Sequence, residues 1–165
     1  MLMKATLFTA HLLLIVCLSH AQQSNNLKQN ALSLEIGKTG LIYNLAFDHK
    51  PITKNIGFRL SVGSNFAAYL QAVSAGGGAY YLTGGSNNFF ELGLDLQYLS
   101  VTEVSDDQRS LTFVYPDYTA KTFYPSLNLG YRSYGNRSLF RVGISPGLIE
   151  GGFVAGGYIS LGVRF

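Results

Sequence analysis

Charged side chains recur at alternate positions of several apolar segments, and these are the residues of the chain that could do chemistry. They are Glu35, Arg59, Glu91, Asp95, Arg132, Arg141 and Arg164. Alternation places them on one face of β-strands. Charges on a face that lines a closed interior must be paired, because burying a lone charge costs several kcal/mol. The pattern favours a structural ion network. The alternative is a polar path for binding or conduction along Arg59, Asp95 and Asn128.

Two of these arginines are expected to lie close together. A two-residue hairpin turn at 135–136, with Gly at its first position, pairs Arg132 with Leu139 and places Arg141 on the same face as Arg132. Two neighbouring cations require a carboxylate near both. Glu91 lies at a similar depth on the preceding strand and is the candidate.

The sequence does not favour enzymatic, metal or phosphate-loop chemistry. His49 is the one histidine beyond the N-terminal segment, and its neighbour Asp48 points to the opposite face of the same strand, where it cannot orient the ring. The carboxylates of the 100–120 segment lack the spacing of a calcium loop. No P-loop lysine follows the glycines at 76–78. We therefore expect no catalytic residues, no metal and no cofactor.

Period-2 alternation predicts the strands that position these side chains, and no helical periodicity is present. The expected strands are 32–37, 41–48, 56–63, 69–82, 90–98, 123–132, 137–145 and 152–165. The glycines at 76–78 predict a bulge or strong bend in the fourth strand. Residues 100–120 form the longest loop, and 146–151 form another. An even strand number places both termini on the periplasmic side and the longest loop outside. The fold class is thus all-β, an eight-stranded antiparallel up-and-down transmembrane β-barrel.

The two ends of the chain indicate its destination. Residues 1–21 have the charge, the apolar run and the small residues of a cleaved signal peptide, and the run is short for a membrane anchor. Residues 22–30 form a polar, flexible lead-in, and 31–165 form the barrel domain. The last strand ends on an aromatic residue, Phe165, with its apolar face suited to lipid. Cleavage after Ala21 removes Cys17, the only cysteine, so disulfides and thiol chemistry are excluded.

The composition agrees with a membrane barrel. Charged residues make up 13% of the chain, against about 25% in typical soluble domains. A formal net charge of +3 gives no argument for nucleic acid as a partner. The alternative is a soluble, lipocalin-like periplasmic barrel with the apolar residues inside and an apolar ligand in its core.

Three segments carry a resemblance to a known group. They are LSLEIGKTGLIYNLAFDHK (32–50), FFELGLDLQYLS (89–100) and LGYRSYGNRSLFRVGISPGLIEGGFVAGGYISLGVRF (129–165). In them the chain resembles the small eight-stranded outer-membrane β-barrel proteins of Gram-negative bacteria, particularly uncharacterised barrels of the Bacteroidota. The resemblance implies an outer-membrane address with membrane lipid as a partner. It also implies that Phe165 is the assembly signal through which the barrel-assembly machinery recognises the C-terminal strand. It implies no catalytic activity.

The hypothesis from sequence is therefore a non-enzymatic outer-membrane barrel with a packed polar lumen. Its role would be structural, or a surface interaction through the external loops. Tyr115 and Tyr118 in the long loop are the candidate surface contacts. A narrow transport or small-ligand-binding barrel is the alternative within the membrane.

Overall fold

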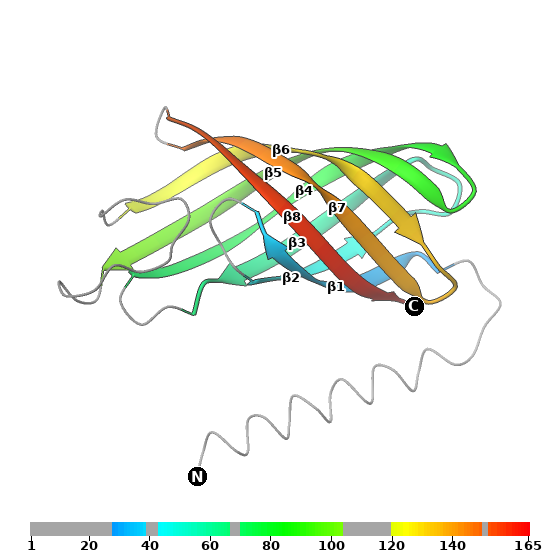
Figure 1. Ribbon diagram of the computed structural model, residues 1–165, viewed down its shortest axis with the longest axis horizontal. Coiled ribbons are helices and arrows are strands. Elements are labelled where there is room, and N and C mark those ends of the chain that lie inside the picture. Colours follow the sequence, from blue (N-terminus) through cyan, green and yellow to red (C-terminus); the bar gives the residue numbers. More distant parts are fainter. Residues whose placement is uncertain (1–27, 39–42, 67–69, 104–119, 150–151) are drawn as a thin grey trace, which may run out of the picture.

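The structure is a computed structural model that describes residues 28–38, 43–66, 70–103, 120–149 and 152–165. These residues form a closed antiparallel barrel in which each strand pairs with its neighbour in sequence and β1 pairs with β8 (Figure 1). The strands are β1 (Asn30–Gly37), β2 (Tyr43–His49), β3 (Ile56–Ser64), β4 (Leu70–Gly85), β5 (Asn88–Glu103), β6 (Ala120–Tyr134), β7 (Ser138–Ile149) and β8 (Gly152–Arg164). The described residues contain no helix long and apolar enough to cross a membrane. The predicted all-β, eight-stranded up-and-down barrel is confirmed.

The barrel has two unlike ends. β1 starts and β8 finishes at one of them, which we call the terminal end, and Figure 1 shows the C-terminus there. The turns that join β2 to β3, β4 to β5 and β6 to β7 lie at this end as well. We call the opposite end the loop end. The strands extend toward it by different amounts, because β4 and β5 have 16 residues each, whereas β1 and β2 have only 8 and 7. The barrel wall is therefore much taller on one side.

Several sequence predictions lie outside the described residues. These are the signal peptide 1–21, the start of the 22–30 lead-in, and Tyr115 and Tyr118 in the long loop. The predicted loop bounds of 100–120 are too wide, because β5 continues to Glu103 and β6 begins at Ala120. The ladder between these two strands reaches the pair Val101 and Ala120, which satisfies backbone groups that a loop would leave to solvent.

The prediction of a loop from Pro146 is wrong. β7 runs through Pro146 to Ile149, and Pro146 pairs with Ala155 of β8. A proline cannot donate a backbone hydrogen bond, so it is tolerated in a strand only where the ladder can do without that donor. Toward β6 the pairing has such a gap, between the pairs Ser126–Gly147 and Leu129–Ile144. The backbone hydrogen bond that Pro146 cannot donate is therefore missing only where β7 is already unpaired with β6.

The predicted bulge at 76–78 is also absent. Gly76, Gly77 and Gly78 pair one-to-one with residues of β3 on one side and of β5 on the other. A Cβ at Gly78 would lie 2.1 Å from the carbonyl oxygen of Leu94 and 2.2 Å from Oδ1 of Asp95. The glycines therefore serve close packing of the neighbouring strand and its lumen side chains, rather than a bulge.

The β6–β7 hairpin differs from the prediction by two residues. Arg132 pairs with Arg141 rather than with Leu139, and the turn lies at 136–137, closed by a hydrogen bond from Gly135 N–H to the Ser138 carbonyl. A shift of two residues preserves the side-chain faces because the strand period is two. The predicted faces hold, and the two arginines are direct cross-strand neighbours.

Candidate functional site

The barrel has an inverted distribution of polarity. Its buried side chains are largely polar or charged, whereas large apolar side chains cover the outside: Leu60 is 64% exposed and its strand neighbour Arg59 only 2%. Polar-in and apolar-out alternation on a closed barrel is the signature of an outer-membrane-type barrel. It is the opposite of the soluble lipocalin-like alternative, which needs an apolar interior.

The outward face of β5 shows where the apolar band ends. Phe90, Leu92, Leu94 and Leu96 face outward, and Tyr98 packs on Phe123 of β6 with ring centroids 5.0 Å apart. Beyond this pair the outward positions become polar, with Ser100 opposite Lys121 and then Thr102. Aromatic girdles mark the interfaces of such barrels. Four further aromatic residues are exposed on the outer face: Tyr43, Phe47, Tyr131 and Phe165.

Three arginines and three carboxylates meet across the lumen, and we call them the ion network. Its members are Glu35, Asp48, Arg59, Glu91, Arg132 and Arg141, which come from six of the eight strands. Glu91 lies at the centre. Arg132 Nε donates to its Oε2 at 2.6 Å, and Arg141 donates to Oε2 from Nε at 3.0 Å and to Oε1 from Nη2 at 2.7 Å. Arg59 Nη1 lies 3.4 Å from Oε1. One carboxylate thus binds all three guanidinium groups.

Asp48 and Glu35 complete the network. Oδ1 of Asp48 accepts from Arg59 Nη2 at 2.8 Å and from Arg132 Nη2 at 3.0 Å, while Oε2 of Glu35 accepts from Arg141 Nη1 at 2.7 Å. The formal charges balance, three against three. All six residues are at most 2% exposed, so their charges depend on one another rather than on water.

Sequence reasoning missed Asp48 as a network member. Its alternation with Phe47 already placed it on the inward face, but only its relation to His49 was considered. In the structure Asp48 binds arginines, and the His49 ring instead contacts Asn30, with 2.8 Å between Nδ1 and Oδ1. The signal was present in the strand pattern.

Two of the predicted network residues lie elsewhere. Asp95 pairs with Lys38, a residue at the end of β1 that no strand pattern placed in the lumen. Arg164 lies at the terminal end, where it donates to the carbonyls of Gly135 at 3.0 Å and Lys28 at 2.8 Å. Among the ion pairs formed by the described residues, none involves Arg164. The interior therefore holds a central network, a separate Lys38–Asp95 pair and an arginine at the mouth.

Tyrosines that point inward pack on the arginines. The guanidinium of Arg132 lies 4.0 Å from the ring centroid of Tyr80, and that of Arg141 lies 4.8 Å from the ring centroid of Tyr158. Such stacking stabilises a buried cation. Glycine on the neighbouring strand leaves space for such a ring, since a Cβ at Gly130 would lie 2.5 Å from the Tyr158 hydroxyl.

An apolar cluster occupies the loop end of the lumen. It consists of Ala72, Leu99, Val101, Tyr124 and Ile149, with Val154 packed against it. All five are at most 4% exposed. They lie on the inward face of the tall part of the wall, at the same end where the outward face becomes polar. On β5 and β6 the outward residues beside this cluster are polar, whereas Leu148 of β7 and Phe153 of β8 are apolar and exposed.

Comparisons with known proteins find only weak structural similarity. No protein-family model matches the chain, and no curated protein matches it. Among solved structures, Ail of Yersinia pestis in a phospholipid bilayer nanodisc has a TM-score of 0.49 at 8% identity, covering 84% of this chain and 100% of that one. The crystal structure of Ail gives 0.45 at 8%, with the same coverage. Neisserial surface protein A gives 0.45 at 14%, covering 82% of this chain and 93% of that one. The assignment of the fold rests on the strand pairing and polarity of this chain itself.

Proposed function

We propose that this protein is a non-enzymatic outer-membrane barrel with a closed lumen, and that it acts through its external loops. The observation that carries the proposal is that side chains fill the lumen at two depths of the barrel. The ion network fills the lumen on the terminal side, and the apolar cluster fills it at the loop end. An eight-stranded interior is just wide enough for side chains to fill it. The surface beyond the membrane is then the part left for interaction with a partner.

The transport alternative predicts an open route along Arg59, Asp95 and Asn128. These side chains are 1–3% exposed, Arg59 is bound by Asp48 and Glu91, and Lys38 covers Asp95. Their burial supports a closed lumen over a route. Conductance in planar lipid bilayers tests this directly: we expect ion conductance near zero for the wild type and for Glu91→Ala. A steady conductance in the wild-type protein would overturn the proposal.

The external role rests on residues 104–119, with Tyr115 and Tyr118 as candidate contacts. The strands that flank this segment, β5 and β6, extend past the point where their outward residues become polar. Trypsin added to intact cells tests the topology, because Arg109 supplies a cleavage site in the segment. We expect a single nick there with the barrel protected. Protection of the segment in intact cells, with cleavage only after lysis, would place it on the wrong side.

Assembly is the second part of the proposal. We propose that the barrel-assembly machinery recognises the C-terminal strand with Phe165, and that membrane lipid contacts the apolar band. Phe165 is 47% exposed on the outer face, and its backbone exchanges hydrogen bonds with Asn30, 3.0 Å and 3.2 Å long, at the β1–β8 closure. An exposed aromatic side chain at the closing strand is available to a partner before the barrel closes.

A further inference from the structure

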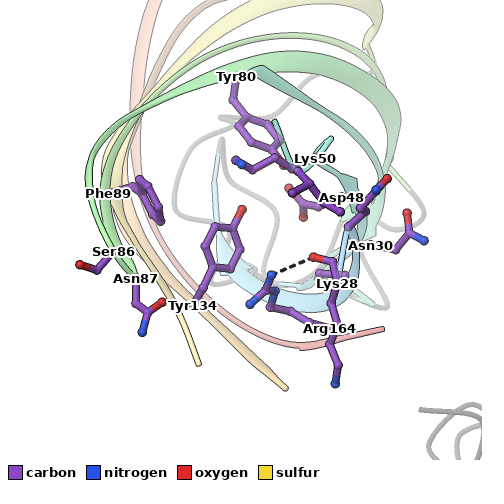
Figure 2. Close-up of a pocket in the computed structure, with 13 residues that line it drawn as sticks. Lys28, Asn30, Asp48, Lys50, Tyr80, Ser86, Asn87, Phe89, Tyr134 and Arg164 are labelled. Carbon is purple, nitrogen blue, oxygen red and sulfur yellow. Dashed lines mark hydrogen bonds between the residues drawn. The ribbon is translucent and has the colours of Figure 1, made fainter. Parts of the chain in front are cut away.

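The terminal end of the lumen opens into a cavity of about 180 Å³, which we call the vestibule. Figure 2 shows its wall residues, with the rings of Tyr80 and Tyr134 projecting inward from different sides, Lys50 beside Tyr80, and Asp48 and Arg164 on the remaining wall. The vestibule lies at the end opposite the external loops, and it shares Asp48 with the ion network.

Cations dominate the lining of the vestibule. Lys28, Lys50 and Arg164 line it, and none of them takes part in the ion pairs formed by the described residues. Among the described residues, the Lys50 amine donates to one partner, the carbonyl of Pro51 at 3.4 Å, which is a weak contact. Burial, then repulsion by Arg164 and Arg132, lowers the pKa of Lys50 from its usual 10.5. Positive charge is in excess here.

The vestibule also offers hydroxyl donors. Tyr80 is 3% exposed, and its hydroxyl has no hydrogen-bond partner among the described residues. The Tyr134 hydroxyl accepts a bond of 2.8 Å from Arg132 Nη1, so its own hydrogen remains for another acceptor. A buried donor without a partner costs free energy, and a bound acceptor recovers it.

One hydrogen-bond acceptor in the vestibule, Oδ2 of Asp48, limits which anions can bind there. Asp48 lines the vestibule, and while its Oδ1 is bound by two arginines, its Oδ2 has no partner among the described residues. An anion that presents only acceptor atoms would be repelled there. A phosphate monoester in its monoanionic form carries one P–OH group that can donate to Oδ2, while its other oxygens accept from the cations and tyrosines.

We propose that the vestibule is a binding site for a phosphate monoester group, held by Lys50 and Arg164 and by the hydroxyls of Tyr80 and Tyr134. Asp48 selects the protonated form of the monoester over a diester or a carboxylate. The group could be presented by a soluble molecule or by a lipid headgroup, since the vestibule opens at the terminal end of the barrel.

The test is a titration of the folded barrel with inorganic phosphate in maltoside micelles, which contain no phosphate. At pH 6 inorganic phosphate carries at least one P–OH in either of its ionic forms, and a phosphate monoester, whose second pKa is about 6, still keeps its hydroxyl in about half of the molecules. The ionic strength is held constant with chloride. The signals followed are the Lys50 amide and the Arg164 Nε–H in ¹H–¹⁵N spectra. We expect saturable shifts, with dimethyl phosphate and acetate binding at least about tenfold more weakly because the bond to Asp48 is missing.

Lys50→Gln should weaken phosphate binding about tenfold, since it removes a charge-assisted hydrogen bond. Lys121→Gln is the matched control, because it removes an exposed lysine at the loop end. Shifts that do not saturate, or equal weakening in both variants, would overturn the site. Equal affinity for dimethyl phosphate would overturn the assignment to a monoester.

A second preparation in phosphatidylcholine nanodiscs that contain phosphatidate identifies the source of the phosphate group. If phosphatidate already produces the shifts, the proposed ligand is a lipid headgroup. If only added phosphate produces them, it is a soluble monoester. Absence of the shifts with both probes would overturn the proposal.

Discussion

The balance of the ion network predicts a large loss of stability in Glu91→Gln. Glu91 is fully buried and accepts from Arg59, Arg132 and Arg141, and the network carries three positive and three negative charges. Glutamine keeps the shape of the side chain but leaves one arginine charge uncompensated inside the lumen. Breaking a buried ion pair costs about 3–5 kcal/mol. We expect the free energy of unfolding to fall by that amount.

Urea unfolding of the barrel in phospholipid vesicles, followed by the gel shift between boiled and unboiled samples, measures this change. Glu35→Gln is the matched comparison, because it leaves the same uncompensated charge but breaks one ion pair, with Arg141, instead of three, and should cost about 3 kcal/mol, the lower end of that range. Adding Arg59→Leu to Glu91→Gln restores the charge balance, since Asp48 keeps its pair with Arg132 and Glu35 keeps its pair with Arg141, and should recover part of the loss. A Glu91→Gln barrel within about 1 kcal/mol of the wild type, the range of surface pairs, would refute the network as a stabilising unit.

Three further predictions concern packing, depth and assembly. Gly78→Ala should destabilise the barrel by about 1–3 kcal/mol, since its Cβ would overlap Leu94 O, whereas Gly85→Ala meets nothing within 4 Å and should be neutral in the same unfolding assay. Leu94→Arg should cost about 2–4 kcal/mol in vesicles, whereas Thr102→Arg, on the same face of β5 beyond the apolar band, should cost about 0–1; equal costs would contradict the membrane boundary at Tyr98. Phe165→Ser should lower the amount of barrel assembled in cells while refolding into detergent stays unchanged, and parallel losses in both would argue for a purely structural role.

The sequence by itself determined the faces and the number of the strands. Side chains on a strand alternate with a period of two, so Glu91 among Phe90 and Leu92 is assigned to the lumen without knowledge of any partner strand. The same rule placed Asp48 inward. It also survived the error in the β6–β7 hairpin, because a shift of two residues leaves every face unchanged.

Only the tertiary structure decided which inward residues meet. The register of eight strands sets the depth of each side chain, and a turn centred one residue later moves Arg141 from a diagonal position to one opposite Arg132. Closure of the barrel brings Glu35 of β1 to Arg141 of β7, 106 residues apart in the chain. Lys38, which follows β1, meets Asp95 of β5, 57 residues away in the chain.

Local rules also failed where tertiary contacts outweighed them. Pro146 and the glycines at 76–78 are turn and bulge signals when read locally. In the barrel, Pro146 is held in β7 by its pairing with β8, and Gly78 is required by the closeness of β5. Periodicity along one strand is a local property that the sequence contains. Register, depth and close packing depend on the neighbouring strands, and they exist only when the barrel has closed.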